Sequence, residues 1–233
     1  MDPVVLLRGA VALTGRFPAL SGVDLSVGPG EVVSVVGANG AGKTTLLRVC
    51  AGLVPVSSGE AMVLGVDLRA DPSAVRRRVG LLGHAPSLYD ELTAAENVRF
   101  ALRAAGLGAA GATPALERVG ITGRLAKTVA GGLSAGQRRR VALAALVARA
   151  PELWLLDEPH AGLDAGARNL LSDLVTEAVR SGASVLFSSH ESDVAMAMSD
   201  RRVTMAGGRV ADVTSGGRRA KLAAVGEGGS HVA

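Results

Sequence analysis

The sequence predicts an α/β fold with a mainly parallel sheet, an N-terminal antiparallel β region and an α-helical insert. Short apolar runs, VVSVV, PELWLLDEP and ASVLFSSH, alternate with segments of helical spacing, which is typical of strands in a parallel sheet. Shorter alternating runs near the N-terminus indicate antiparallel strands joined by turns. A long Ala-rich stretch, 93–149, indicates helices between two of the parallel strands.

The first third of the chain is expected to place a glycine-rich loop between a buried strand and a helix. VVLL, VALT and ALSGVDLSV, between Val4 and Val27, indicate strands joined by turns. GPGE predicts a turn into the β-branched run 32–36. After the glycines, the segment 43–51 has helical spacing and stops before Gly52.

The remaining elements are expected in the order strands, helical insert, strand, helix, strand and hairpin. SSGEAMVLGVDLR and RRRVGLLGH predict strands and turns, and LLSDLVTEAVRS predicts a helix before the strand in ASVLFSSH. RRVTMAGGRVADV predicts a hairpin around Gly207 and Gly208. We therefore expect one domain over 1–214, with its helical insert at about 85–150, and a flexible tail over 215–233.

Composition excludes several classes of protein. The 233 residues are 48% hydrophobic and 2% aromatic, which favours one domain with an Ala, Val and Leu core. Cys50 is the only cysteine, so an intrachain disulfide and a four-cysteine metal site are excluded. The net charge of +4 comes from arginines spread over helices without interleaved aromatics, which favours solvated faces and no nucleic acid partner. The sequence has neither a membrane-spanning apolar run nor a secretory signal pattern, so a cytosolic location is expected.

The segment 37–44 fits GxxxxGK[ST] at every fixed position and lies between a predicted strand and a predicted helix. Glycines let backbone N–H groups converge on phosphate oxygens, and the helix N-terminus adds a positive dipole. Lys43 can reach the β- and γ-phosphates, and Thr44 can ligate Mg²⁺. The predicted ligand is a nucleoside triphosphate.

Two acids, Asp157 and Glu158, end the buried strand LWLL, where ligands of open α/β sheets gather. Asp157 is predicted to hold Mg²⁺ through water, and Glu158 to orient and deprotonate the attacking water. Capping of the next helix is the alternative for such a pair. The phosphate loop upstream favours the catalytic interpretation.

LSAGQ, at 133–137, precedes three arginines and an Ala-rich helix. Its serine, backbone amides and helix N-terminus are compatible with either an anion site or an N-cap.

Together these motifs resemble those of ABC ATPases, over about residues 1–212 and in the family's order. LSAGQ resembles the LSGGQ signature, 161–164 resembles the D-loop of the dimer seam, and Ser188, Ser189 and His190 resemble the segment of the switch histidine. The resemblance implies a P-loop NTPase (RecA-like) core and a cofactor set of ATP and Mg²⁺. It also implies that ATP is held by one subunit's phosphate loop and the other subunit's signature. The implied ATP-binding residues are Gly37, Ala38, Asn39, Gly40, Ala41, Gly42, Lys43, Thr44, Thr45, Ser134, Gly136 and Gln137. The implied catalytic residues are Glu158, His190 and Lys43, and the implied metal ligands are Thr44 and Asp157.

Two positions depart from the family pattern. His84 stands where the family usually has a glutamine between catalytic core and helical insert. The adenine-stacking aromatic would fall near Thr14, and the nearest ring is that of Phe17, for which core packing is the alternative. Metal sensing by His84 and base stacking by Phe17 therefore stay open.

A narrower resemblance links the chain to the ATP-binding subunits of the haem exporter used in cytochrome c maturation. Gly83, His84, Ala135 and Trp154 match that subfamily, whereas the segment 159–164, where that subfamily more often has Phe-Thr, and the long Gly/Arg tail depart from it. The resemblance implies two partners, a polytopic membrane permease and a second ATP-binding subunit. Tyr89 lies where the family docks a coupling helix, with a core position as the alternative. A soluble ABC ATPase of iron–sulfur assembly type is the alternative function, and a nonhydrolysing scaffold would have to lack Glu158 or His190.

Overall fold

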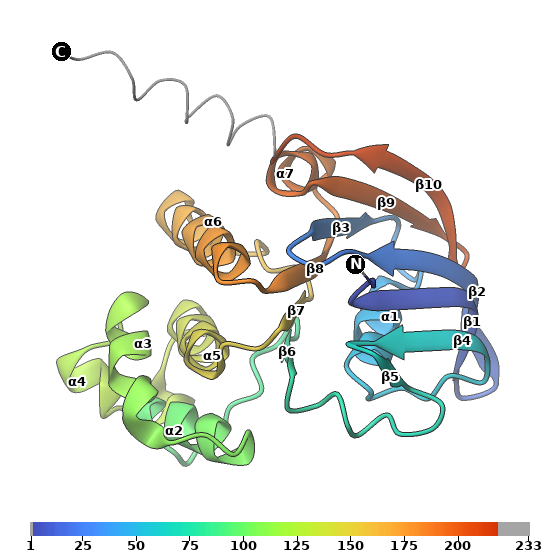
Figure 1. Ribbon diagram of the computed structural model, residues 1–233. Helices are drawn as coiled ribbons and strands as arrows, with labels where there is room; N and C mark the ends of the chain where they lie inside the picture. The colour runs from blue at the N-terminus through green and yellow to red at the C-terminus, as the bar shows by residue number, and fades with distance from the viewer. Residues whose placement is uncertain (1, 219–233) are drawn as a thin grey trace, which may run out of the picture.

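The computed structural model describes residues 2–218, and their strands form two sheets (Figure 1). The first sheet is antiparallel, in the order β2–β1–β4–β5: β1 (Val5–Thr14), β2 (Phe17–Val27), β4 (Ser58–Val63) and β5 (Val66–Asp67). The second sheet has the order β10–β9–β3–β8–β7–β6: β3 (Val32–Val36), β6 (Val79–Leu82), β7 (Leu153–Leu156), β8 (Ser184–Ser189), β9 (Arg201–Ala206) and β10 (Arg209–Ser215). Only β10 of this second sheet is antiparallel to its neighbour, so the predicted α/β class and mainly parallel sheet are confirmed.

The strand β3 and the helix α1 (Lys43–Cys50) enclose the glycine loop, as expected. Every residue of β3 is buried, because its β-branched side chains pack on both faces of a central parallel strand. Figure 1 shows α1 between the two sheets, and Leu46 and Leu47 of this helix join the core that β1 and β2 cover. The loop is therefore fixed at both ends by buried elements.

The first strand corrects one expectation. VVLL and VALT belong to one strand, β1, rather than to two. Its register against β2 shifts between Leu7 and Ala10, and Gly9 between them has φ +56°. A glycine in this conformation produces a bulge that bends the strand without ending it.

The helical insert contains α2 (Ala94–Ala104), α3 (Ala112–Arg118), α4 (Gly123–Ala126) and α5 (Ala135–Arg149), with short 3₁₀ turns at Ala109–Gly111 and Ala130–Gly132. The helix α2 begins with a capping box between Thr93 and Glu96. Buried residues of α2, α3 and α5 share one core with Trp154 of β7. Figure 1 shows these helices grouped away from the antiparallel sheet.

The C-terminal part contains one helix that sequence patterns did not predict, α7 (Ser192–Met198). The predicted helix at 170–181 is longer, because α6 (Ala165–Arg180) begins at the N-cap Asp164. The hairpin of β9 and β10 turns at Gly207 and Gly208 as expected.

Residues 215–218 hydrogen bond to the rest of the domain, although the flexible tail was expected to begin at Ser215. Ser215 is the last residue of β10, and Arg218 donates a hydrogen bond to Asp200 Oδ2 at 3.0 Å. The rest of the expected tail, 219–233, lies outside the described residues. Over residues 2–218, no helix combines the length and the apolar character needed to cross a membrane.

The turn after α1 gives a stability prediction. Gly52 has φ +66°, and a Cβ added there would lie 1.9 Å from the carbonyl oxygen of Pro72. Gly106 follows α2 with φ +79°, and a Cβ there would meet nothing within 4 Å. In both alanine variants the new residue must adopt a left-handed backbone conformation, which costs about 1–2 kcal/mol. We expect Gly52→Ala to lower the free energy of unfolding by about 1–3 kcal/mol more than Gly106→Ala in urea titrations, because only Gly52→Ala also forces a backbone clash. Equal losses would contradict this.

Candidate active site

The phosphate loop lies at the carboxyl end of β3. Lys43 is 6% exposed, and its Nζ donates hydrogen bonds to the carbonyl oxygens of Gly37 at 2.7 Å and Ala38 at 3.1 Å. A Cβ at Gly37 would lie 2.3 Å from the carbonyl oxygen of Met205, so only glycine fits between the loop and β9. The ammonium group of Lys43 is therefore held inside the loop by the loop's own carbonyl oxygens.

The acidic pair meets this loop through Thr44. Thr44 Oγ1 donates a hydrogen bond to Asp157 Oδ2 at 2.9 Å, and Ser188 Oγ donates one to Asp157 Oδ1 at 2.6 Å. The pairing of β7 with β8 brings Ser188 beside Asp157. Two predicted metal ligands, Thr44 and Asp157, therefore lie within hydrogen-bond distance of each other.

Glu158 has an unusual backbone. Its φ of +47° lies in the left-handed region, which costs a non-glycine residue roughly 1–2 kcal/mol. Its N–H donates to Ser188 Oγ at 2.9 Å, and its carbonyl accepts a hydrogen bond from Arg139 at 2.8 Å. Residues held in such a strained conformation cluster at functional sites.

Two histidines face the Glu158 carboxylate. His190 Nδ1 lies 3.4 Å from Glu158 Oε2, and His84 Nδ1 lies 3.8 Å from the same oxygen. Both imidazoles are more than half exposed, whereas the Glu158 side chain is 22% exposed. Three side chains from three separate loops thus converge on one point beside the phosphate loop.

The signature segment does not join this cluster within one copy of the chain. Ser134 and Gln137 form a capping box, in which Gln137 N–H donates to Ser134 Oγ at 3.2 Å and Ser134 N–H donates to Gln137 Oε1 at 2.9 Å. Over the described residues, no hydrogen bond connects this pair to the phosphate loop. The N-cap interpretation is therefore confirmed, Gly136 is exposed beside it, and an anion-binding role stays a prediction.

Three residues near the site were missed as contributors by sequence reasoning: Ser188, Arg139 and His160. His160 is 3% exposed and lies edge-on to Phe187, with ring centroids 6.1 Å apart. The pKa of His160 is lowered to about 4, chiefly by burial; the positive charges of Arg168 and Arg139 also lower it, and Glu191 opposes them. His160 is therefore neutral at physiological pH. Among these three residues, only Ser188 could have been found from the sequence, because it stands two residues before His190 on a buried strand.

The two open aromatic positions are both on the surface. Phe17 is 80% exposed, so core packing is excluded for it. Tyr89 is 53% exposed and meets Phe100 edge-on, with ring centroids 4.8 Å apart. The rings of Tyr89 and Phe100 line a cavity of about 280 Å³ between the loop at 87–89 and the helices α2 and α5.

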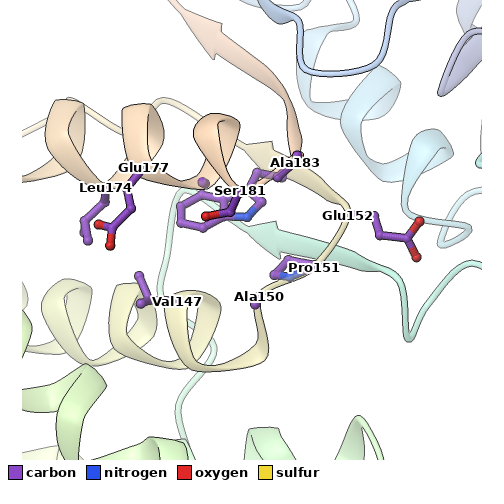
Figure 2. Close-up of a pocket in the computed structure, with 11 residues that line it drawn as sticks. Val147, Ala150, Pro151, Glu152, Leu174, Glu177, Ser181 and Ala183 are labelled. Atoms are coloured by element: carbon purple, nitrogen blue, oxygen red, sulfur yellow. The ribbon is translucent and has the colours of Figure 1, made fainter.

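A second cavity, of about 260 Å³, lies at the other end of β7 from the acidic pair (Figure 2). Figure 2 shows Val147 of α5 opposite Leu174 of α6, with Pro151 at the chain entry to β7. Ligands of parallel sheets bind at the carboxyl ends of strands, whereas this cavity is at an amino end. It therefore has no place in the active site.

The comparison with known proteins agrees with this geometry. The family described as ABC transporter matches residues 20–161. The chain belongs to the ABC transporter family. As an ABC cassette, it binds ATP and is an ATPase.

Individual relatives narrow the comparison. The chain is 42% identical over 203 residues to the cytochrome c biogenesis ATP-binding export protein CcmA of Paraburkholderia xenovorans, covering 79% of this chain and 89% of that protein. It is 40% identical over 207 residues to the methionine import ATP-binding protein MetN of Caulobacter vibrioides, covering 85% of this chain and 62% of that protein. The cassette is thus CcmA-like in sequence, but it also resembles subunits named for other cargo.

Solved structures agree in fold. The cassette superposes with a TM-score of 0.81 and 27% identity on a dimeric post-hydrolysis state of the ATP-binding cassette MJ0796 bound to ADP and phosphate, covering 91% of this chain and 98% of that one. An ATP-binding subunit of an ABC transporter gives a TM-score of 0.83 at 28% identity, covering 95% of this chain and 94% of that one.

Proposed function

We propose that this cassette powers a separate, polytopic membrane permease. The observation that carries the proposal is the exposed aromatic pair of Tyr89 and Phe100 beside a cavity between the catalytic core and the helical insert. Exposed rings at the edge of a concave surface are typical of interaction sites. Asn97 supports this surface, because its side-chain amide hydrogen bonds to both the N–H and the carbonyl of Tyr89.

Hydrolysis would use the residues that converge beside the phosphate loop. Glu158 accepts a proton from the attacking water as the water oxygen bonds to the γ-phosphorus. The bond from the γ-phosphorus to the bridging oxygen breaks, and its electron pair leaves with ADP. Lys43 stabilises negative charge on the phosphoryl oxygens, and His190, 3.4 Å from the Glu158 carboxylate, contacts the γ-phosphate and the water.

The oxygen ligands next to the loop fit Mg²⁺. Thr44 Oγ1 and Asp157 Oδ2 lie 2.9 Å apart, and Mg²⁺ prefers one or two such oxygens together with substrate phosphates. No cluster of three His, Cys, Asp or Glu side chains over residues 2–218 could hold a metal by itself. Thr44 and Asp157 would therefore hold Mg²⁺ jointly with ATP, and bound Mg²⁺ would neutralise charge on the phosphates.

A second ATP-binding subunit would complete the site. The loop 37–45 of one copy and Ser134, Gly136 and Gln137 of the other would enclose each ATP, in a homodimer or with a relative. The exposure of the signature segment supports this, since Ser134 and Gly136 are accessible. The similar cassette MJ0796 is described as dimeric with ADP and phosphate bound. Phe17 is exposed and lies two residues before Ala19, whose carbonyl oxygen lies close to Gly42 of the loop. We expect the Phe17 ring to contact the adenine ring.

The proposed permease partner implies a cellular location for the cassette. A cassette bound to a permease would be cytoplasmic and peripheral on the inner face of the cell membrane. The proposed cargo is haem, exported for cytochrome c maturation. The similarity to the cytochrome c biogenesis ATP-binding export protein CcmA of Paraburkholderia xenovorans supports this assignment. A soluble assembly ATPase of the iron–sulfur type is the alternative, and it would have only soluble partners.

Co-purification tests the permease proposal. We expect a tagged cassette from detergent-solubilised native membranes to recover one polytopic membrane protein in stoichiometric amount, identified by mass spectrometry. We expect the double variant Tyr89→Ala, Phe100→Ala to recover less than about one tenth of it, since aromatic anchors dominate interface energies. ATP hydrolysis by the isolated variant should stay within about twofold, because neither ring touches the catalytic cluster.

Leu53→Ala is the matched control, because Leu53 is also 53% exposed but lies after α1, away from this cavity. It should recover the membrane protein normally. Recovery of only soluble partners by the unmodified cassette would favour the assembly class. The identity of a recovered permease would support or overturn the haem assignment.

A further inference from the structure

Arg139 connects three parts of the active site through one buried side chain. It belongs to α5, two residues after Gln137, and it is 7% exposed. One terminal nitrogen donates to the His84 carbonyl at 3.1 Å, and the other donates to the Glu158 carbonyl at 2.8 Å. These bonds join the signature helix to the loops of His84 and Glu158, whose side chains face each other with His84 Nδ1 3.8 Å from Glu158 Oε2.

The burial of this guanidinium needs a reason. Desolvation lowers the pKa of Arg139, and the negative charges of Asp157 and Glu158 partly oppose that effect. Its Nε has no hydrogen-bond partner among the described residues. A buried cation with one unsatisfied donor is unfavourable for stability alone, and such groups are often retained for a specific arrangement.

The arrangement that Arg139 determines is that of Glu158. The N–H of Glu158 is fixed by Ser188 and its carbonyl by Arg139, so both peptide groups of this left-handed residue are held. The same guanidinium fixes the backbone of His84, whose imidazole lies 3.8 Å from the Glu158 carboxylate. The direction of that carboxylate therefore depends on a residue that does not touch it.

We propose that Arg139 is a positioning residue for ATP hydrolysis. It couples the signature helix α5 to the Glu158 carboxylate. The inference rests on the proposed role of Glu158. When the signature segment of one copy contacts ATP held by the other, any displacement of α5 is transmitted through Arg139 to Glu158 and His84 of its own subunit. Signature engagement and water activation are thereby linked within one chain.

Arg139→Lys tests the inference, because lysine keeps the charge but cannot bridge two carbonyls with a planar fork. We expect kcat to fall about 10- to 100-fold, since a displacement on the order of 1 Å at a reacting group has effects of this size. The Kd for ATP, measured by calorimetry on the full chain, should stay within about threefold, because Arg139 donates to the carbonyls of His84 and Glu158 and, within residues 2–218, forms no hydrogen bond with the loop that would hold the phosphates.

Arg149→Lys is the matched control. Arg149 lies at the other end of α5, donates to the carbonyls of Arg76 at 3.2 Å and Val79 at 3.0 Å, and also has a buried Nε without a partner over residues 2–218. Both bonds come from one terminal nitrogen, and the substitution removes a buried guanidinium that joins two carbonyls away from Glu158. We expect a similar fall in melting temperature for the two variants, but a change in kcat of less than about threefold for Arg149→Lys.

A Glu158→Gln background separates positioning from general destabilisation. If Arg139 acts through Glu158, adding Arg139→Lys to Glu158→Gln should lower the residual single-turnover rate by less than about twofold, because contributions of residues acting as a unit do not add. Equal kcat values for the Arg139→Lys and Arg149→Lys variants, or full additivity with Glu158→Gln, would overturn the inference. Normal turnover by Glu158→Gln alone would instead overturn the proposed role of Glu158.

Discussion

Glu158→Gln is expected to lower the steady-state rate of ATP hydrolysis at least about 100-fold, the usual scale for loss of a general base. The amide cannot accept the proton of the attacking water, but it has the shape of the carboxylate. The backbone bonds of Glu158 to Ser188 and Arg139 involve only its N–H and carbonyl, so they persist in the variant. ATP binding should therefore be retained while turnover stops.

The same variant should accumulate an ATP-bound dimer. Hydrolysis is the step that would reopen two copies closed on ATP, so blocking it leaves the closed state populated. We expect light scattering after size exclusion to show a dimer in ATP and a monomer in ADP. Phosphate release measures the rate in the same samples.

Glu152→Gln provides the control for Glu158→Gln. Glu152 precedes the same strand, β7, and forms an exposed ion pair with Arg78, with Arg78 Nε 2.6 Å from Glu152 Oε1. The same chemical change at this position should leave hydrolysis within about twofold, since exposed ion pairs contribute little. Normal turnover by Glu158→Gln would exclude Glu158 as the base.

Lys43→Ala is expected to abolish measurable nucleotide binding, with the affinity for ATP falling at least about 100-fold. Removing one partner of a buried, hydrogen-bonded charge pair costs about 2–5 kcal/mol. Lys43 also donates to the carbonyls of Gly37 and Ala38, so its loss leaves these carbonyls without that donor. Calorimetric titration with ATP and Mg²⁺ measures the change directly.

Lys127→Ala controls for the loss of one positive charge, because Lys127 follows α4 in the helical insert. Its affinity for ATP should be unchanged. Thermal unfolding of both variants shows whether they are folded. A folded Lys43→Ala protein with the affinity of the original chain would refute the phosphate-loop assignment.

The predicted site depended on residues that are close in sequence or that end strands. The loop 37–44 was predictable because its glycines, its lysine and the following helix act within one short segment. Asp157 and His190 were predictable because each follows a buried strand, and parallel strands place their carboxyl ends at one edge. The same logic identified the insert, whose helices show their period locally.

The tertiary structure alone decided which side chains meet across large separations. Arg139 looked like one of three equivalent arginines, until packing of α5 brought it to the carbonyls of His84 and Glu158. The exposure of Phe17 and Tyr89 was also undecided, because either ring suits a core or a surface.

The sequence by itself determined the fold class, the order of the elements and the phosphate loop, because helix and strand periods and glycine backbone chemistry act over a few neighbouring residues. The left-handed Glu158, the convergence of His84 and His190 on its carboxylate, and the Arg139 bridge were decided by tertiary structure. Each depends on packing between segments tens of residues apart, and no short pattern encodes such packing.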